Sequence, residues 1–420
     1  MAKQGRSTVV PRLRFPEFRE STGWSVSALA DVADFVNEKI TSSSVSTTNY
    51  VSTENLLQGY GGVAAASKLP AVDSVTRFRA GDVLISNIRP YLKKVWHADR
   101  DGGASNDVMV VRAKGQASST YLASVLKSDS FIAYVMVGAK GVKMPRGDVD
   151  SIRRYPVAHP GVHEQQKITD CLTSLDELIA AQGRKVEALK TYKRGLMQQL
   201  FPREGETLPR LRFPEFRDAP EWKLRPLGQM TSKVGSGITP LGGDRNYKAH
   251  GRPFVRSQNV GWGELLLDDV AYIDDETHLS FDATEIQLHD VLLNITGASI
   301  GRSAVADARI VGGNVNQHVC IIRLRPDELS PALLNQFLIS ERGQKQIDDF
   351  QAGGNRQGLN FAQIRSFEIP LPPTRAEQQR VAECLVSLDA RIAVEAEKLE
   401  SLKTHKKGLM QQLFPAPEEA

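Results

Sequence analysis

Apolar residues recur in alternating steps of four and three along residues 164–201, a stretch without proline that ends at Pro202. This spacing predicts one long α-helix whose apolar positions form a heptad seam. A second run of the same kind covers residues 377–415. We expect the following residues to form a helix–helix seam: Leu172, Leu175, Ile179, Val186 and Leu189 in the first run, and Leu385, Leu388, Ile392, Leu399 and Leu402 in the second.

The two runs are copies of one another. Residues 164–202 and 377–415 are identical at 24 of 39 aligned positions. Polar residues interrupt both seams at matching places, Gln182 with Glu395 and Lys193 with Lys406. Two helices with the same seam in one chain most simply pack on each other, and polar seam positions can fix their register. A helix of about 37 residues spans about 55 Å, which equals about 16 base pairs of DNA.

A second repeat shows that the whole chain is a duplicated module. The nine letters PRLRFPEFR occupy residues 11–19 and again 209–217, and Trp24 matches Trp222 at the same offset. Between these ends, residues 25–155 and 223–369 share little beyond short pieces such as GDVLI at 81–85 and HDVLL at 289–293. A framework that repeats while its inserts differ suggests two similar modules aimed at different targets, although a duplication that merely drifted gives the same pattern.

The repeats predict an α+β fold with pseudo-two-fold internal symmetry, in which two α/β domains are separated by two long antiparallel, coiled-coil helices. The expected boundaries are a first domain at 1–162, a central helix at 163–202, a second domain at 203–375, a C-terminal helix at 376–415 and a tail at 416–420. An alternative is a coiled coil that serves only for dimerisation.

Both variable domains have the pattern of mixed α and β structure with many turns. In the first domain we expect strands at 81–88 and 108–111 and a helix at 121–137. In the second domain we expect strands at 291–295, 304–306 and 319–324 and a helix at 331–350. Neither domain shows the regular strand–helix alternation of a doubly wound sheet.

Polar and glycine-rich loops supply candidate DNA-binding residues. Arg and Lys can bind phosphates or guanine, and Asn and Gln can read adenine with paired hydrogen bonds. Glycine and asparagine are also common in ordinary solvated turns, so each residue has that alternative. The candidates are Asn87, Arg89, Lys93, Lys94, Lys140, Lys143 and Arg146 in the first domain, and Arg256, Gln258, Asn259, Thr296, Arg302, Asn314, Asn316, Gln317, Asn355, Arg356 and Gln357 in the second. The acidic stretch 268–276 is expected to be a solvated face away from DNA.

Composition and charge narrow the classes of protein without deciding between them. The chain has 420 residues, 41% hydrophobic and 24% charged, with a net charge of +4, which is typical of a globular protein of two or three domains. Residues 218–375 carry 16 Lys and Arg against 19 Asp and Glu, so any DNA binding there uses local patches. Three cysteines without a Cys-x-x-Cys pair, and no long apolar run, favour a cytoplasmic protein without a zinc site or a membrane segment.

Motifs for catalysis are missing from the sequence. It contains no Walker loop, no His-Glu-x-x-His and no methylase motif, and Gly235-Ser-Gly-Ile-Thr-Pro240 lacks the third glycine of a dinucleotide loop. We therefore expect a non-catalytic chain that holds no cofactor or metal of its own.

The order of these pieces resembles the specificity subunit of type I restriction–modification systems. The resemblance rests on LRFPEF at 13–18 and 211–216, GDVLISNIRPYLKKVW at 81–96, GVKMPRGD at 141–148, LLNITGASIGR at 292–302, NVNQHV at 314–319 and GLNFAQIRSFEIPLPP at 358–373, with an EQQ helix closing each half. One departure is His159-Pro160-Gly161-Val162-His163, where the family usually has a Pro-Pro pair.

The resemblance implies two target recognition domains, each reading one half of a bipartite double-stranded DNA target. It implies that the two helices set the spacing and dock two methylase subunits for adenine methylation, and that motor–nuclease subunits add ATP-dependent cleavage. S-adenosylmethionine, ATP and magnesium would then belong to the partner subunits. The alternatives are a free-standing bipartite DNA-binding regulator without restriction partners, and a scaffold protein with no DNA role.

Overall fold

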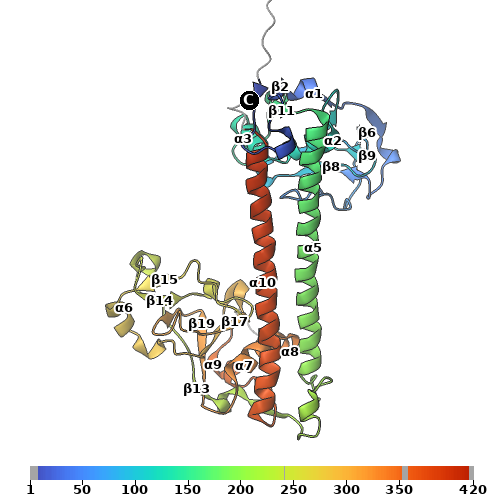
Figure 1. The fold of residues 1–420 in the computed structure, drawn as a ribbon. Helices are drawn as coiled ribbons and strands as arrows, with labels where there is room; N and C mark the ends of the chain where they lie inside the picture. Colours follow the sequence, from blue (N-terminus) through green and yellow to red (C-terminus); the bar gives the residue numbers. More distant parts are fainter. Residues whose placement is uncertain (1–7, 241, 352–357, 416–420) are drawn as a thin grey trace, which may run out of the picture. The chain divides into compact units, whose positions relative to one another are not determined.

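The computed structural model describes residues 8–240, 242–351 and 358–415 (Figure 1). The chain divides into two compact units, which we call the first unit (1–182 with 398–420) and the second unit (183–397). Each unit holds one mixed α/β domain and one end of each long helix. Among the described residues, no helix is long and apolar enough to cross a membrane.

The first unit contains three sheets and four short helices. The sheets have the strand orders β1-β2-β11, β3-β10-β7-β8 and β4-β6-β9-β5. The strands are β1 (Thr8–Val9), β2 (Trp24–Ala28), β3 (Ala33–Phe35), β4 (Lys39–Thr41), β5 (Tyr50–Val51), β6 (Ser74–Phe78), β7 (Val83–Ser86), β8 (Val95–His97), β9 (Gly102–Ala104), β10 (Val108–Ala113) and β11 (Pro156–His159). The helices are α1 (Leu29–Val32), α2 (Ser119–Leu126), α3 (Asp129–Val137) and α4 (Val149–Arg153), followed by the start of α5 (Val162–Leu200).

The second unit is built in the same way. Its sheets have the strand orders β12-β20, β13-β19-β16-β17 and β15-β14-β18. The strands are β12 (Lys223–Pro226), β13 (Thr231–Ser236), β14 (Arg252–Val255), β15 (Ala271–Ile273), β16 (Val291–Asn294), β17 (Ser303–Val305), β18 (Asn314–Val315), β19 (Val319–Leu324) and β20 (Glu368–Leu371). The helices are α6 (Asp275–Leu279), α7 (Pro331–Leu338), α8 (Glu341–Gln351) and α9 (Phe361–Arg365), followed by the start of α10 (Arg375–Leu413).

The two variable domains share a topology although their sequences differ. The sheet β3-β10-β7-β8 of the first unit and the sheet β13-β19-β16-β17 of the second connect equivalent strands in the same order, antiparallel throughout. An ion pair of a buried aspartate with a partly exposed arginine recurs in both sheets: Asp82 binds Arg112 at 2.7 Å, and Asp290 binds Arg323 at 2.8 Å. Both aspartates follow a left-handed residue in the GDV and HDV motifs, so the short sequence echo marks a shared turn into a core strand.

The expected helices at 121–137 and 331–350 are each two helices, which corrects the sequence prediction. Ser128 ends the first stretch and caps α3, because its hydroxyl accepts a hydrogen bond from the amide of Phe131 at 3.2 Å. Ser340 does the same before α8, where its hydroxyl accepts from the amide of Gly343 at 3.2 Å. A serine that caps a new helix start interrupts an apolar periodicity that continues across the break.

The long helices run antiparallel within each unit. In the first unit, Ile168 and Leu172 share a core with Leu413, and Asp176 pairs with Lys406 at 2.5 Å. In the second unit, Lys193 pairs with Asp389 at 2.5 Å and Lys185 with Glu395 at 2.5 Å. All ten predicted seam residues are buried or half-buried. The fold class predicted from the sequence, two α/β domains and two long antiparallel helices, is confirmed.

The repeated motifs contact one another, which gives them a structural role. In the first unit the guanidinium of Arg14 binds the carboxylate of Glu164 through two hydrogen bonds of 2.7 Å, and the Leu13 amide donates to the Gln412 carbonyl at 3.0 Å. In the second unit Arg212 binds Glu377 at 2.7 and 2.8 Å, in the same arrangement. The Leu211 amide likewise donates to the Gln199 carbonyl at 2.9 Å, so in each unit the LRFPEF motif docks on the first turn of one long helix and on the last turn of the other.

The first glutamine of each EQQ motif attaches the long helix to the domain core. The side-chain oxygen of Gln165 accepts from the Ser118 amide at 2.9 Å, at the start of α2. The side-chain oxygen of Gln378 accepts from the Ser330 amide at 3.0 Å, at the start of α7. Each glutamine thus satisfies an amide next to the first turn of a helix, where backbone donors lack intrahelical partners.

Candidate nucleic-acid interface

Two loops of the first unit meet at one end of the sheet β3-β10-β7-β8. Residues 87–94 follow β7, and residues 138–147 follow α3. The Arg89 amide donates to the Pro145 carbonyl at 2.8 Å, and the Gly147 amide donates to the Asn87 carbonyl at 3.1 Å. The Asn87 amide in turn donates to the carbonyl of Asp107, directly before β10, at 2.9 Å. Backbone hydrogen bonds therefore hold both loops in one place.

This loop pair presents exposed cations beside an apolar tip. Arg89, Lys140, Lys143 and Arg146 are all exposed. The backbone of Arg89 is left-handed, with φ 52°, a conformation rare in non-glycine residues and maintained here by the neighbouring loop. At the tip, 99% of Val142 and 51% of Met144 are exposed. Cations suit phosphates and guanine edges, whereas exposed apolar groups suit the thymine methyl group or a base step.

Two of these cations pair with nearby carboxylates and still remain exposed to solvent. Lys140 pairs with Asp148 at 2.9 Å while 81% of its side chain stays exposed. Hydrogen bonding to Lys140 lowers the pKa of the Asp148 carboxyl, so this carboxyl is ionised at neutral pH. Arg146 pairs with Asp107 at 3.2 Å. Such exposed pairs are weak and can exchange an acid for a phosphate.

Lys93 and Lys94, also predicted to bind DNA, are half-buried and make contacts within the domain. The ammonium of Lys93 pairs with Asp129 at the start of α3 at 2.5 Å. The ammonium of Lys94 donates to the carbonyl of Thr53 at 2.5 Å. Both side chains hold the loop to the rest of the domain. The Asn87 side chain is half-buried, and its oxygen has no hydrogen-bond partner among the described residues.

In the second unit, a hydrogen-bonded cluster lies at the equivalent end of the sheet β13-β19-β16-β17. The hydroxyl of Thr296 and Nδ1 of His318 are 2.6 Å apart, and Nε2 of His318 lies 3.1 Å from the side-chain nitrogen of Gln317. The Thr239 hydroxyl donates to the oxygen of Gln317. Thr239 and Gln317 are exposed. Amide and imidazole groups on one surface offer both donors and acceptors to base edges.

Arg302 lies in the same β16–β17 hairpin as Thr296. Its side chain is half-exposed and makes no hydrogen bond or ion pair with any other described residue. The Asn294 amide donates to the Arg302 carbonyl at 2.8 Å, which fixes the backbone of the hairpin. Arg302 is therefore an available cation beside the cluster of Thr296, Gln317 and His318.

Three of the asparagines predicted to read DNA are buried in the second unit. Asn314 is fully buried, where its side-chain oxygen contacts Nδ1 of His278 at 2.7 Å. Asn259 is 1% exposed and closes a turn after β14, since its oxygen accepts from the Arg256 amide at 3.0 Å. Asn316 is 7% exposed, and its oxygen accepts from the His318 amide at 3.0 Å. Asn259 and Asn316 thus satisfy backbone amides in turns, whereas Asn314 bonds to the side chain of His278 in the core.

Asn55 in the first unit repeats the role of Asn259. Its side-chain oxygen accepts from the Ser52 amide at 2.6 Å, in the turn after β5. The pieces TENL at 53–56 and SQNV at 257–260 therefore form the same turn in two domains of different sequence.

Arg256 and Gln258 lie against the acidic stretch rather than away from it. The guanidinium of Arg256 donates to the Asp269 carbonyl at 2.6 Å, and the amide of Gln258 donates to the Asp269 carboxylate at 2.5 Å. Their hydrogen-bonding groups are thus partly occupied. The remaining candidates, Asn355, Arg356 and Gln357, lie outside the described residues.

Sequence reasoning missed Asp107, Thr239 and His318, as well as the apolar tip at Val142. Asp107 and His318 occupy equivalent places, because each directly precedes the central strand β10 or β19. The aligned pieces SNDVMV at 105–110 and NQHVCI at 316–321 carry this signal, but it becomes visible only once the two strands are known to be equivalent. Within the described residues, no group of three His, Cys, Asp or Glu side chains could hold a metal ion.

Comparison with known proteins agrees with this architecture. Residues 221–404 match the type I restriction modification DNA specificity domain. The MjaVIII specificity subunit of a type I restriction enzyme from Methanocaldococcus jannaschii is 21% identical over 283 residues, covering 66% of this chain and 65% of that protein. The alignment thus spans slightly less than two thirds of the relative.

Two solved structures share the fold over nearly the whole chain. The S subunit of a type I restriction–modification system from M. genitalium has a TM-score of 0.60 at 13% identity, covering 97% of this chain and 99% of that one. A chain from a structure of type I R-M complex assembly and conformational transition has a TM-score of 0.59 at 20% identity, covering 93% and 97%.

Proposed function

We propose that this chain is a specificity subunit of a type I restriction–modification system, and that each of its two α/β domains reads one half of a bipartite double-stranded DNA target. The observation that carries this proposal is the shared strand order of the two domains, combined with different loops at the same sheet end. Equivalent frameworks with different side chains are suited to bind the same kind of ligand with different base preferences.

In the first domain, Arg89, Lys143 and Arg146 would bind phosphates or guanine, and Val142 would contact an apolar base surface. In the second domain, Thr239, Gln317 and His318 would contact base edges, with Arg302 as the available cation. This division is supported by exposure, because these side chains reach solvent while Asn259 and Asn314 do not. Exposed cations give affinity for any DNA, and the polar groups at base edges give sequence preference.

The partners and the chemistry follow from the family and belong to the proposal. The two long helices would set the distance between the half-sites and dock two methylase subunits. Those subunits would bind S-adenosylmethionine and methylate adenine, and motor–nuclease subunits would use ATP and magnesium to cleave unmodified DNA. This chain would act in the cytoplasm as a non-catalytic subunit. Purified alone, it should transfer no methyl group to DNA from a labelled donor.

A domain exchange tests the proposal directly. Residues 223–369 would be replaced by the matching domain of a relative with a known half-site, and the methylated motif read by methylome sequencing with the methylase present. We expect one half of the motif to change and the other half and the gap to stay. As a matched control, the same residues would be exchanged for those of a relative with the same half-site. A change in both halves, or in neither, would refute separate recognition by the two domains.

A further inference from the structure

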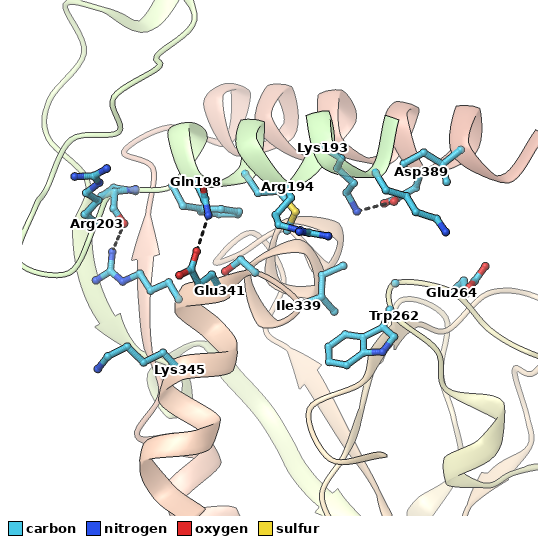
Figure 2. Close-up of a pocket in the computed structure, with 18 of the residues that line it drawn as sticks. Lys193, Arg194, Gln198, Arg203, Trp262, Glu264, Ile339, Glu341, Lys345 and Asp389 are labelled. Atoms are coloured by element: carbon cyan, nitrogen blue, oxygen red, sulfur yellow. Dashed lines mark hydrogen bonds and ion pairs between the residues drawn. The ribbon is translucent and has the colours of Figure 1, made fainter. Parts of the chain in front are cut away.

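A cavity of about 1050 Å³ lies in the second unit. Its walls come from the end of α5, the middle of α10, the start of α8 and the turn around Trp262 (Figure 2). This volume slightly exceeds the usual range for small-molecule sites, about 300–1,000 Å³. The proposed reading of DNA by the loops does not require this cavity.

One side of the cavity is aromatic and apolar. Trp262 is 52% exposed, whereas Trp24, Trp96 and Trp222 are 1%, 7% and 2% exposed. The turn that carries it is fixed, since the Gly263 amide donates to the Ser303 carbonyl at 2.9 Å. Figure 2 shows the indole beside Ile339, on the same side as Glu264. An exposed tryptophan held rigidly at a cavity wall is suited to stack on a planar ring.

The opposite side is cationic. Figure 2 shows Arg203 and Lys345 there, across Glu341 from Trp262. Arg342 also lines the cavity and donates to the Pro202 carbonyl at 2.7 Å, and partial burial lowers the pKa of its guanidinium. The guanidinium of Arg203 makes no ion pair or hydrogen bond with any other described residue. A half-buried guanidinium beside an unpaired one indicates a place for an anion.

The charge balance of the lining points the same way. Six cations and four carboxylates line the cavity. Two carboxylates are already paired: Asp389 with Lys193 at 2.5 Å and Glu204 with Lys345 at 3.3 Å. Glu341, in the middle, accepts a hydrogen bond of 2.6 Å from the Gln198 amide and keeps acceptor capacity for hydroxyl groups.

We infer that this cavity binds a nucleoside polyphosphate, with the base on Trp262, the ribose hydroxyls on Glu341 and the phosphates on Arg203 and Arg342. Each part of such a ligand meets a group of matching chemistry, in the order in which these groups lie along the cavity. Recognition would depend on side chains, so it needs no glycine-rich phosphate loop. The inference does not depend on the proposed DNA target.

The first unit lacks the same site, although its framework is equivalent. In the repeat, Asp129 matches Glu341 and Ser130 matches Arg342. Asp129 is already paired with Lys93 at 2.5 Å and with Lys407 at 3.4 Å. Lys127 replaces Ile339, and its burial lowers the pKa of its ammonium group. In the first unit, lysine side chains of the chain itself occupy the carboxylate equivalent to Glu341. We therefore expect the ligand to bind in the second unit alone.

Equilibrium dialysis of the full-length chain with labelled ATP tests the inference, together with protection of tryptophan fluorescence from acrylamide quenching. We expect one saturable site per chain and protection of Trp262, the exposed tryptophan. Trp262→Ala should weaken ATP binding at least about fivefold, because stacking on a base is worth about 1–3 kcal/mol, and Trp262→Phe should largely restore it. Arg203→Ala and Arg342→Ala should each weaken binding about tenfold or more.

Controls separate this site from general charge and from DNA binding. Arg217→Ala removes an exposed arginine of the same unit outside the cavity and should leave ATP binding unchanged. Tripolyphosphate and adenosine should each bind at least about tenfold more weakly than ATP. Trp262→Ala should keep target DNA binding, so failure here is distinct from failure of the DNA proposal. The inference would be overturned if ATP showed no saturable binding, or if tripolyphosphate bound as tightly as ATP. It would also be overturned if Arg217→Ala weakened ATP binding as much as the cavity variants do. Binding of a single-stranded oligonucleotide to this cavity, with no binding of ATP, would overturn it as well.

Discussion

Replacing Arg14 by alanine should unfold the first unit at a markedly lower temperature. The side chains of Arg14 and Glu164 are 6% and 4% exposed, and two hydrogen bonds of 2.7 Å join them. Arg14 also donates to the carbonyls of Ser21 and Thr22 at 2.8 and 3.0 Å. The alanine variant would leave the carboxylate of Glu164 buried without its partner and two carbonyls without a donor.

The magnitude follows from this geometry. Removing one partner of a buried ion pair costs about 3–5 kcal/mol, because the other charge stays desolvated. In a unit of about 200 residues, each kcal/mol shifts the melting temperature by about 2–4 °C. The expected shift is therefore about 6–20 °C. Replacing both residues by Met and Leu should cost less, because no charge is left buried, although the carbonyls of Ser21 and Thr22 still lose their donor.

Differential scanning calorimetry of the full chain measures the shift. Arg19→Ala is the matched control, since Arg19 is an exposed arginine in the same motif. Its melting temperature should stay within about 2 °C of the wild type, as is usual for a surface substitution of up to about 0.5 kcal/mol. If Arg14→Ala melts like Arg19→Ala, or if the double replacement is as damaging as Arg14→Ala, the motif is not an electrostatic anchor and the reasoning is wrong.

Three further outcomes are expected. The double variant Lys140→Ala, Lys143→Ala should bind any DNA with a shallower slope of log affinity against log salt concentration. The slope should fall by about 0.9 for each phosphate that a lysine no longer neutralises, whereas the control Lys68→Ala should keep the wild-type slope. An unchanged slope in the double variant would show that these lysines do not contact DNA phosphates. Burial raises the pKa of the Cys320 thiol to about 12, so this thiol should react very slowly at neutral pH. Mass spectrometry after treatment with iodoacetamide should show label on Cys171 and Cys384, and on Cys320 only after the chain unfolds. Seven residues inserted after Val186 keep the heptad seam in phase and lengthen α5 by about 10.5 Å. Methylome sequencing should then show either no methylation or a gap between the half-sites that is longer by about one to three base pairs. The original gap at full occupancy would contradict the spacing role of the helices.

The long helices and the duplication could be predicted from the sequence because both depend on local pattern. A heptad seam of about 37 residues is unambiguous, and nine identical letters need no structure to be seen. The split at Ser128 was missed because apolar periodicity continues across it, while a single hydroxyl starts a new helix. The common strand order of the two domains was also missed, since sheet order is set by pairing between distant strands that share few residues.

Candidate site residues were harder to predict because the same residue types serve turns and ligands. Asn259 and Gln317 both lie in polar loops, yet the first closes a buried turn and the second is exposed. What separates them is whether a backbone donor lies within reach of the side-chain oxygen, and this depends on how the strands pair. Lys94 shows the same ambiguity, since its ammonium binds the carbonyl of Thr53 in the loop after β5.

The division between framework and loops also explains how two domains can keep one fold while the side chains of their loops differ. Pairs with a buried aspartate, such as Asp82 with Arg112 and Asp290 with Arg323, tolerate little change, because losing the arginine leaves a charge in the core. Lys143 and Arg302 have no such partner among the described residues, and replacing exposed side chains of this kind usually changes stability by less than about 0.5 kcal/mol. Substitutions in these loops therefore cost little stability, whereas substitutions in the sheet that carries them cost more.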